Sequence, residues 1–234
     1  MNDLVIEIAG ARLIPLPSGG LFWPARDLLC VSDLHLGKSD RTARRTGRML
    51  PPYETRDTLA RIEADLATTG ARTLVCLGDS FDDLGAADSM CEDDLLWLTR
   101  LQAGRRWIWI EGNHDPGPIT LGGTHLAELG EGGLSFRHIA RNGARAEVSG
   151  HYHPKAEIIA RGRKVSRPCF LFDAHRLILP AYGTYTGGLR WTTPELRGLV
   201  AERAWAALTG DPVRIVPAPF VAGPGELQGA TAAS

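Results

Sequence analysis

The chain has 234 residues and a formal net charge of -1, with 26 Lys and Arg against 27 Asp and Glu. This length is enough for one sizeable α/β domain, and the balanced charge excludes a globally basic nucleic-acid-binding protein, so any contact with DNA would need a local patch. No apolar run approaches the length of a membrane span and the first ten residues lack a secretory signal, so we expect a soluble cytoplasmic protein with no membrane association.

The first half of the chain alternates apolar runs with segments of helical periodicity. Two short strands are predicted over residues 4–9 and 11–16, and three buried strands over 27–32, 72–77 and 106–111. Helices are predicted over 55–68 and 88–101, where apolar residues recur at helical spacing. The resulting β-α-β-α-β order with short connections predicts parallel strands in one sheet.

The second half is richer in strands. Strand-like segments cover residues 133–138, 144–149, 156–160, 164–172, 176–179 and 212–216. A helix is predicted over 194–208, with Pro194 in its first turn. Two sheets packed face to face with helices outside would accommodate this pattern. We expect one domain over residues 1–221 and a disordered, Gly-rich tail over 222–234.

Residues of the types that bind metals follow three of the predicted strands. Asp33, Asp79 and Asn113 each come directly after a buried apolar run. Ligands bind beyond the carboxyl ends of strands in open α/β sheets, so these side chains should meet at one place. A helix cap or a turn residue is the alternative for any one of them. We do not expect all three to be helix caps or turn residues, because the chain also carries paired histidines downstream, which are further residues of the metal-binding type.

Histidines supply the remaining candidate ligands. His151 and His153 alternate along the chain, and on an extended segment both imidazoles would point to the same side. Gly150 would let the backbone approach the site closely. Two surface histidines in a turn are the alternative. His138 follows an apolar strand and is either a ligand or a histidine at the edge of the core.

The mixture of ligand types indicates the metals and the chemistry. Carboxylate, imidazole and amide groups together suit Mn²⁺, Fe²⁺ or Zn²⁺ better than Mg²⁺ or Ca²⁺. Two such ions about 3.5–4 Å apart can share a bridging carboxylate, hold a hydroxide between them and clamp a phosphate. The residues therefore predict a two-metal hydrolase of phosphate esters that uses two divalent ions, with Mn²⁺ as the first choice.

One ordered series of motifs resembles the calcineurin-like metallophosphoesterase superfamily over about residues 27–153. The series is Asp33-x-His35, Gly78-Asp79, Gly112-Asn113-His114-Asp115, His138 and Gly150-His151-x-His153. The resemblance implies a four-layer αββα sandwich, in which two packed mixed sheets are flanked by helices. It implies two metal sites that share Asp79 as the bridge. The implied ligands are Asp33, His35, Asp79 and His153 for one ion, and Asp79, Asn113, His138 and His151 for the other.

The resemblance also implies a catalytic role for His114. In the family, the histidine at this position is not a ligand but stabilises the phosphate or protonates the leaving oxygen. The residue three positions after the bridging aspartate, here Asp82, would hold the imidazole in one tautomer. Asp83 is the alternative partner. His125 and His175 lie outside the motifs, and we expect them to be surface or structural residues.

Further motifs resemble a bacterial subgroup, the ligase-associated DNA damage response endonucleases. They include Leu50-Pro51-Pro52-Tyr53, Gly150-His151-Tyr152-His153-Pro154 and Leu179-Pro180-Ala181-Tyr182-Gly183. This resemblance implies a DNA endonuclease in repair that is functionally associated with a DNA ligase and a helicase. The subgroup often has histidine where Asp82 stands.

A basic segment follows the first metal motif and offers a place for DNA. It carries Lys38, Arg41, Arg44, Arg45 and Arg48 against one acid, Asp40. Such a loop can hold the phosphates that flank a scissile bond. A solvated helical face is the alternative. Two other functions remain open: a phosphoesterase of small or cyclic nucleotides, which the near-zero charge favours, and a repair scaffold with vestigial catalysis.

Overall fold

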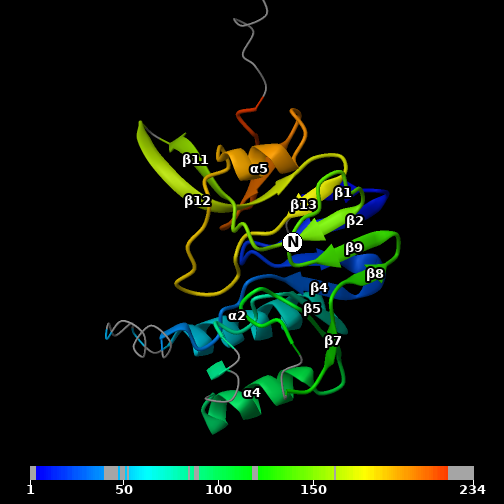
Figure 1. Ribbon diagram of the computed structural model, residues 1–234, viewed down its shortest axis with the longest axis vertical. Helices are drawn as coiled ribbons and strands as arrows, with labels where there is room; N and C mark the ends of the chain where they lie inside the picture. The colour runs from blue at the N-terminus through cyan, green and yellow to red at the C-terminus, as the bar shows by residue number, and fades with distance from the viewer. Residues whose placement is uncertain are drawn as a thin grey trace, which may run out of the picture.

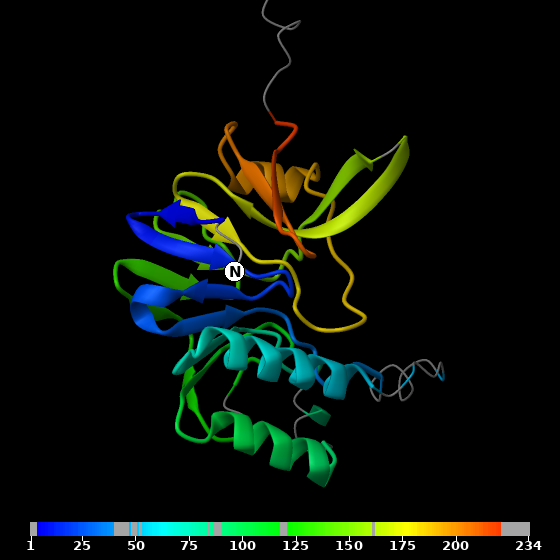
Figure 2. The same cartoon turned by 180° about the vertical axis from the view of Figure 1, so that it is seen from behind.

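Two β-sheets stacked face to face form the body of the protein, with helices on their outer faces (Figure 1). The same layers are seen from behind in Figure 2. The computed structural model describes residues 4–39, 47, 51, 53–83, 85–86, 90–117, 121–160 and 162–220. This arrangement confirms the predicted four-layer αββα sandwich of two mixed sheets.

The first sheet has the strand order β1-β2-β3-β4-β5-β6-β7. Its strands are β1 (Ile6–Ile8), β2 (Ala11–Pro15), β3 (Leu21–Trp23), β4 (Leu28–Val31), β5 (Thr73–Leu77), β6 (Arg106–Ile110) and β7 (Thr124–Leu126). Strands β4, β5 and β6 are parallel, as predicted, so their carboxyl ends lie at one edge of the sheet. The short strands β3 and β7 have no counterpart among the predicted strands.

The second sheet has the order β15-β14-β12-β13-β10-β9-β8, and β11 pairs with β12. Its strands are β8 (Leu129–Glu131), β9 (Leu134–Arg137), β10 (Glu147–Ser149), β11 (Lys155–Ala160), β12 (Arg163–Phe172), β13 (Arg176–Ile178), β14 (Trp205–Leu208) and β15 (Arg214–Pro217). Strands β9, β10 and β13 are parallel neighbours, so this sheet also presents carboxyl ends at a common edge.

Helices α2 (Glu54–Thr69) and α4 (Glu92–Gln102) cover the outer face of the first sheet. The apolar stripe of α2 is buried against that sheet, and the helix ends at Gly70, whose φ of 68° suits a left-handed cap. The short helix α5 (Pro194–Leu199) packs on the second sheet, and a 3₁₀ turn, η1, covers Pro24–Arg26. Among the described residues, no helix is long and apolar enough to cross a membrane.

The main core lies between the two sheets. It joins strands of the first sheet to strands of the second through fully buried side chains, among them Leu13, Val75, Ile108, Phe136, Val148, Phe170 and Leu177. Close packing of this kind fixes the two sheets relative to each other. The loops at their carboxyl ends are therefore held at a fixed separation.

The predicted helix over residues 194–208 is wrong in its second half. Helix α5 ends at Leu199, and Trp205–Leu208 forms strand β14 between β12 and β15. Ala206 and Ala207 are fully buried there. Pairing on both sides and burial outweigh the helix propensity of alanine, which is a weak local preference. Residues 222–234, where we expect a disordered tail, lie outside the described residues.

Candidate metal centre

The predicted ligands come together where strands of both sheets end. The loop after β4 carries Asp33 and His35, the loop after β5 carries Asp79, and the loop after β6 carries Asn113. In the second sheet, the loop after β9 carries His138, and the loop after β10 carries His151 and His153. Backbone hydrogen bonds join these loops, with His35 N donating to Asp79 O at 2.9 Å and Gly150 N to His138 O at 2.9 Å. The site therefore spans the interface between the two sheets.

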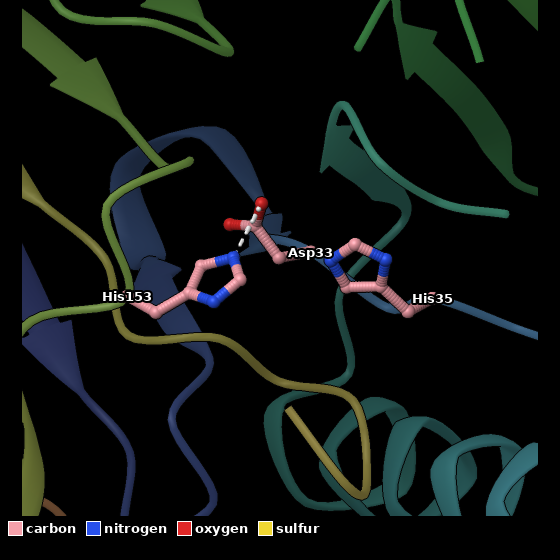
Figure 3. Close-up of side chains that lie close together, drawn as sticks. All are labelled: Asp33, His35 and His153. Carbon is pink, nitrogen blue, oxygen red and sulfur yellow. Dashed lines mark ion pairs between the residues drawn. The ribbon is translucent and has the colours of Figure 1, made fainter. Parts of the chain in front are cut away.

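Asp33, His35 and His153 form the first cluster, with one possible ligand atom from each within 4.8 Å of the others. Figure 3 shows the ring of His153 turned toward the carboxylate of Asp33, with the ring of His35 on the other side. Nε2 of His153 lies 2.9 Å from Oδ1 of Asp33, yet both buried atoms lack a hydrogen-bond partner of suitable geometry within the described chain. Both atoms are therefore available as ligands of a cation held together with His35.

Asp79, His138 and His151 form the second cluster, and Asn113 lies beside it. Nδ1 of His138 lies 2.8 Å from the carbonyl oxygen of Leu77 and must donate its proton there, which leaves Nε2 as an acceptor in the neutral ring. That Nε2 lies 2.9 Å from Oδ1 of Asn113, 3.2 Å from Nδ1 of His151 and 3.4 Å from Oδ1 of Asp79. If the ring is protonated, the single proton on Nε2 can satisfy only one of these neighbours, whereas a divalent cation could bind Nε2 of the neutral ring together with all three.

Asp79 lies between the two clusters. Its Oδ1 is the atom near His138, and its Oδ2 lies 3.9 Å from Nε2 of His35. The two oxygens of this carboxylate therefore face different clusters, which is the arrangement that a bridging ligand requires. The donor atoms fit a pair of divalent ions in number, type and orientation.

His35 is oriented by Asp82. Nδ1 of His35 lies 3.0 Å from Oδ1 of the buried Asp82, so Nε2 is left to face Asp79. Histidines that bind metals commonly donate their other ring N–H to a carboxylate in this way. This partnership could not be predicted, because nothing in the spacing of residues 35 and 82 shows which imidazole ring the carboxylate reaches.

His114 contacts the backbone of Asp82. Its Nδ1 lies 2.9 Å from the Asp82 carbonyl oxygen, while the carboxylate of Asp82 binds His35. This carbonyl fixes the tautomer of His114, and ligand atoms of His35, Asp82 and His114 all lie within 4.8 Å of one another. Nε2 of His114 faces Oδ2 of Asp79 at 4.0 Å, and the side chain is 31% exposed. His114 therefore borders both the clusters and the solvent.

Asp115 fastens the loops that carry Asp79 and Asn113. Its buried carboxylate accepts backbone N–H bonds from four residues, at 2.9 Å from Asp79, 2.8 Å from Ser80, 3.2 Å from Phe81 and 3.1 Å from Gly112. Because each N–H would otherwise be buried without an acceptor, this side chain holds the turn around the bridging residue. Its only signal in the sequence is its place at the end of Gly112-Asn113-His114-Asp115.

The ligand loops have unusual backbone conformations. Five predicted ligands, none of them glycine, have a φ between 45° and 67°: Asp33, His35, Asp79, His151 and His153. Side chains other than glycine rarely adopt this region, and such residues cluster at functional sites. The prediction that His151 and His153 lie on an extended segment is therefore wrong. Left-handed turns direct one imidazole to each cluster.

Gly150 makes the close approach that the sequence predicted. A Cβ built at this position would lie 1.7 Å from Oγ of Ser32 and 2.7 Å from Oδ2 of Asp33. The N–H of His151 donates to the same Oδ2 at 3.0 Å. A side chain at position 150 would thus separate the loop of the second sheet from that of the first.

The charges of the clusters shift the pKa of several members. Burial raises the pKa of Asp79, but the bond and charge of His138 outweigh it and hold the pKa at about 2. Burial likewise raises the pKa of Asp33, but the neighbouring His153, His138 and Ser32 together outweigh it, so that the net pKa is lowered. Burial and the neighbouring charge of His138 lower the pKa of His151. Deprotonated carboxylates and a neutral imidazole are the forms that bind metals.

Other residues named from the sequence lie apart from the clusters or outside the described chain. His125 stacks on Trp109 at 6.4 Å, and His175 lies in the turn before β13. Lys38 is half-buried at the start of the basic segment. Arg41, Arg44, Arg45 and Arg48 lie outside the described residues.

Comparison with family models and with solved structures finds proteins that are similar to this chain. A family model described as calcineurin-like phosphoesterase matches residues 27–156, more than half of the chain. The crystal structure of the nuclease MPE of Pseudomonas putida is 28% identical in sequence, with a TM-score of 0.70. The alignment covers 92% of this chain and 99% of that chain. The search of curated proteins finds no match.

Proposed function

The chain belongs to the calcineurin-like phosphoesterase family, and we propose that within this family it is a two-metal phosphodiesterase that cleaves DNA. Family membership makes it a metal-dependent hydrolase of phosphoester bonds, which confirms the reaction class predicted from the motifs. The observation that carries the proposal is the pair of ligand clusters that meet at Asp79.

The clusters would hold two divalent ions, with Mn²⁺ as our choice because the ligands mix imidazole, amide and carboxylate. Bound there, the ions would supply a nucleophile at neutral pH and neutralise charge on the phosphate. Asp82 keeps Nε2 of His35 directed at the first site. Asp115 keeps the turn that presents Asp79.

His114 acts on the phosphate rather than on the metals. With Nδ1 bound to the Asp82 carbonyl, a protonated ring carries its second N–H on Nε2, on the side of Asp79. From there it can stabilise a phosphate oxygen or protonate the leaving oxygen. Its partial exposure leaves room for a substrate that approaches from solvent.

DNA is the substrate class that we infer, and we propose a role in DNA repair from the resemblance to repair endonucleases. The similar nuclease of Pseudomonas putida supports a polynucleotide substrate. The five basic residues between Lys38 and Arg48, next in sequence to Asp33 and His35, could hold flanking phosphates. Association with a DNA ligase and a helicase, implied by the resemblance to repair endonucleases, is part of the same proposal.

The test is a substrate panel for the Mn²⁺-loaded protein. Circular, linear, nicked and single-stranded DNA would be compared with a phosphomonoester, a cyclic nucleotide and a bis-aryl phosphodiester. We expect cleavage of DNA and of the diester, and none in an Asp79→Asn variant purified in parallel to exclude a contaminating nuclease. Turnover of the cyclic nucleotide with intact DNA would contradict the proposal and favour the small-nucleotide enzyme suggested by the near-zero net charge. No turnover of any substrate by protein shown to hold two ions would favour a scaffold.

A further inference from the structure

The loop between β13 and α5 lies along the metal centre. At one end, Gly183 N donates to the carbonyl oxygen of Asp33 at 3.1 Å, and a Cβ at Gly183 would lie 1.9 Å from the carbonyl oxygen of Leu34. At the other end, a Cβ at Gly188 would lie 2.3 Å from the carbonyl oxygen of His153. The loop is therefore fastened at both ends to segments that carry ligands of the first cluster.

The middle of this loop is held against the first turns of α2, as Figures 1 and 2 both show. Oγ1 of Thr184 donates to Oδ2 of Asp57 at 2.5 Å and accepts from Nη2 of Arg61 at 2.8 Å. Nη1 of Arg61 also donates to the carbonyl oxygen of Tyr182 at 2.6 Å. These bonds fix the backbone on both sides of Gly183 and so determine where Tyr185 lies.

Tyr185 is presented to solvent beside a second exposed tyrosine. Tyr53 immediately precedes α2, and its carbonyl oxygen accepts a hydrogen bond from the N–H of Asp57 at 2.8 Å. The carboxylate of the same Asp57 accepts from Thr184, the residue before Tyr185. The two tyrosines therefore flank the same helical turn although they are far apart in sequence. They are 60% and 39% exposed, and neither phenol makes a hydrogen bond within the described chain.

Tyr182, the other tyrosine of this loop, has a structural role. Tyr182 is fully buried and its hydroxyl donates to Oδ2 of Asp65 at 2.9 Å. Tyr185 has no comparable bond or burial, and its φ of 62° is unfavourable for a bulky side chain. Strained residues of this kind persist at functional sites, so packing does not account for Tyr185.

We propose that Tyr53 and Tyr185 form a platform on which unpaired bases stack next to the scissile phosphodiester. The inference rests on the proposed function and narrows its substrate to DNA with a single-stranded region. Aromatic side chains stack on any base once it is unpaired, whereas the bases of an intact duplex are already stacked on each other. Lys155 lies at the other end of the loop, since its Cε lies 2.9 Å from a Cβ built at Gly188. Its ammonium group could bind a phosphate of the DNA backbone there.

The platform is tested by binding and by KM. A Tyr53→Ala/Tyr185→Ala variant would be titrated with a labelled single-stranded oligonucleotide and with an abasic oligomer of the same length. We expect the double alanine variant to lose roughly tenfold to 100-fold in affinity for the oligonucleotide, with a matching rise in KM, and little for the abasic oligomer. Tyr53→Phe/Tyr185→Phe should keep the wild-type affinity, because the ring face and not the hydroxyl stacks. Trp205→Ala, which removes an exposed aromatic from β14, is the matched control.

Three results would overturn the platform. They are an equal loss on the abasic oligomer, a phenylalanine variant as weak as the alanine variant, and an unchanged affinity in the alanine variant. Failure of the proposed function has a different signature. In that case no metal-loaded protein would cleave DNA, while tyrosine-dependent binding of single strands would persist.

Discussion

Replacing Gly150 by alanine should damage the metal centre, because the added methyl group has no room between the two sheets. The added Cβ would lie 1.7 Å from Oγ of Ser32 and 2.7 Å from Oδ2 of Asp33. Non-bonded heavy atoms pack at about 3.5–4.0 Å, so the two loops would have to separate by roughly 2 Å. The N–H of His151, which donates to Asp33 at 3.0 Å, would move with them.

This separation of the loops should lower both the stability of the protein and its turnover. Overpacking of this kind costs about 1–3 kcal/mol in the free energy of unfolding. A misplacement of about 1 Å at a reacting centre can lower turnover by roughly 100-fold, and Gly150 lies between ligands of both clusters. We therefore expect Gly150→Ala to fold, with reduced stability, and to lose most of its turnover and part of its bound metal.

The assay compares Gly150→Ala with a control glycine and a suppressor. Gly198→Ala adds a methyl group in α5 where no atom lies within 4 Å, so it should keep full turnover. Ser32→Ala combined with Gly150→Ala removes the closest atom and should recover part of the metal content and turnover. Turnover of a bis-aryl phosphodiester and metal content would be measured for each variant. Wild-type values for Gly150→Ala, or no recovery in the double variant, would refute the steric reasoning.

Three further outcomes follow from the site and its surroundings. His114→Ala should keep its metal content and lose roughly 100- to 10,000-fold in turnover; loss of metal instead would make His114 a ligand. His153→Ala should weaken one metal site, whereas Asp33→Ala should weaken both, because Asp33 also holds the N–H of His151; calorimetric titration with Mn²⁺ distinguishes them. Burial raises the pKa of Asp65 above its usual value, so its contribution to stability is present below about pH 4 and is lost as pH rises through the raised pKa. Asp65→Asn should flatten that decline in urea unfolding, and an unchanged slope would exclude Asp65 as its source.

The ligand-bearing loops could be predicted because they follow simple strands. Asp33, Asp79 and Asn113 come directly after apolar runs that are too short for helices, and parallel strands place such ends together. The strand assignment depends only on hydrophobic patterning, which is local. The convergence of these residues then follows from the order of elements along the chain.

The details of the loops could not be predicted for a physical reason. The left-handed turns at His151 and His153 are not preferred by histidine, and they are held by contacts with another sheet. The carboxylate of Asp82 could reach either His35 or His114, and only the path of the loop decides. Strand β14 was missed similarly, because the two sheet neighbours that stabilise Ala206 and Ala207 are distant in sequence.

The position of the site at the sheet interface explains why its loops tolerate strain. Four of the five left-handed ligands donate their backbone N–H to another loop. The acceptors are Gly78 for Asp33, Asp79 for His35, Asp115 for Asp79, and Asp33 for His151. The cost of each turn is about 1–3 kcal/mol, comparable to one or two buried hydrogen bonds. Asp115 alone accepts four backbone N–H bonds around the Asp79 turn. The close-packed core between the sheets therefore sets the separation of the two clusters, and a cavity opened in that core should loosen both metal sites together.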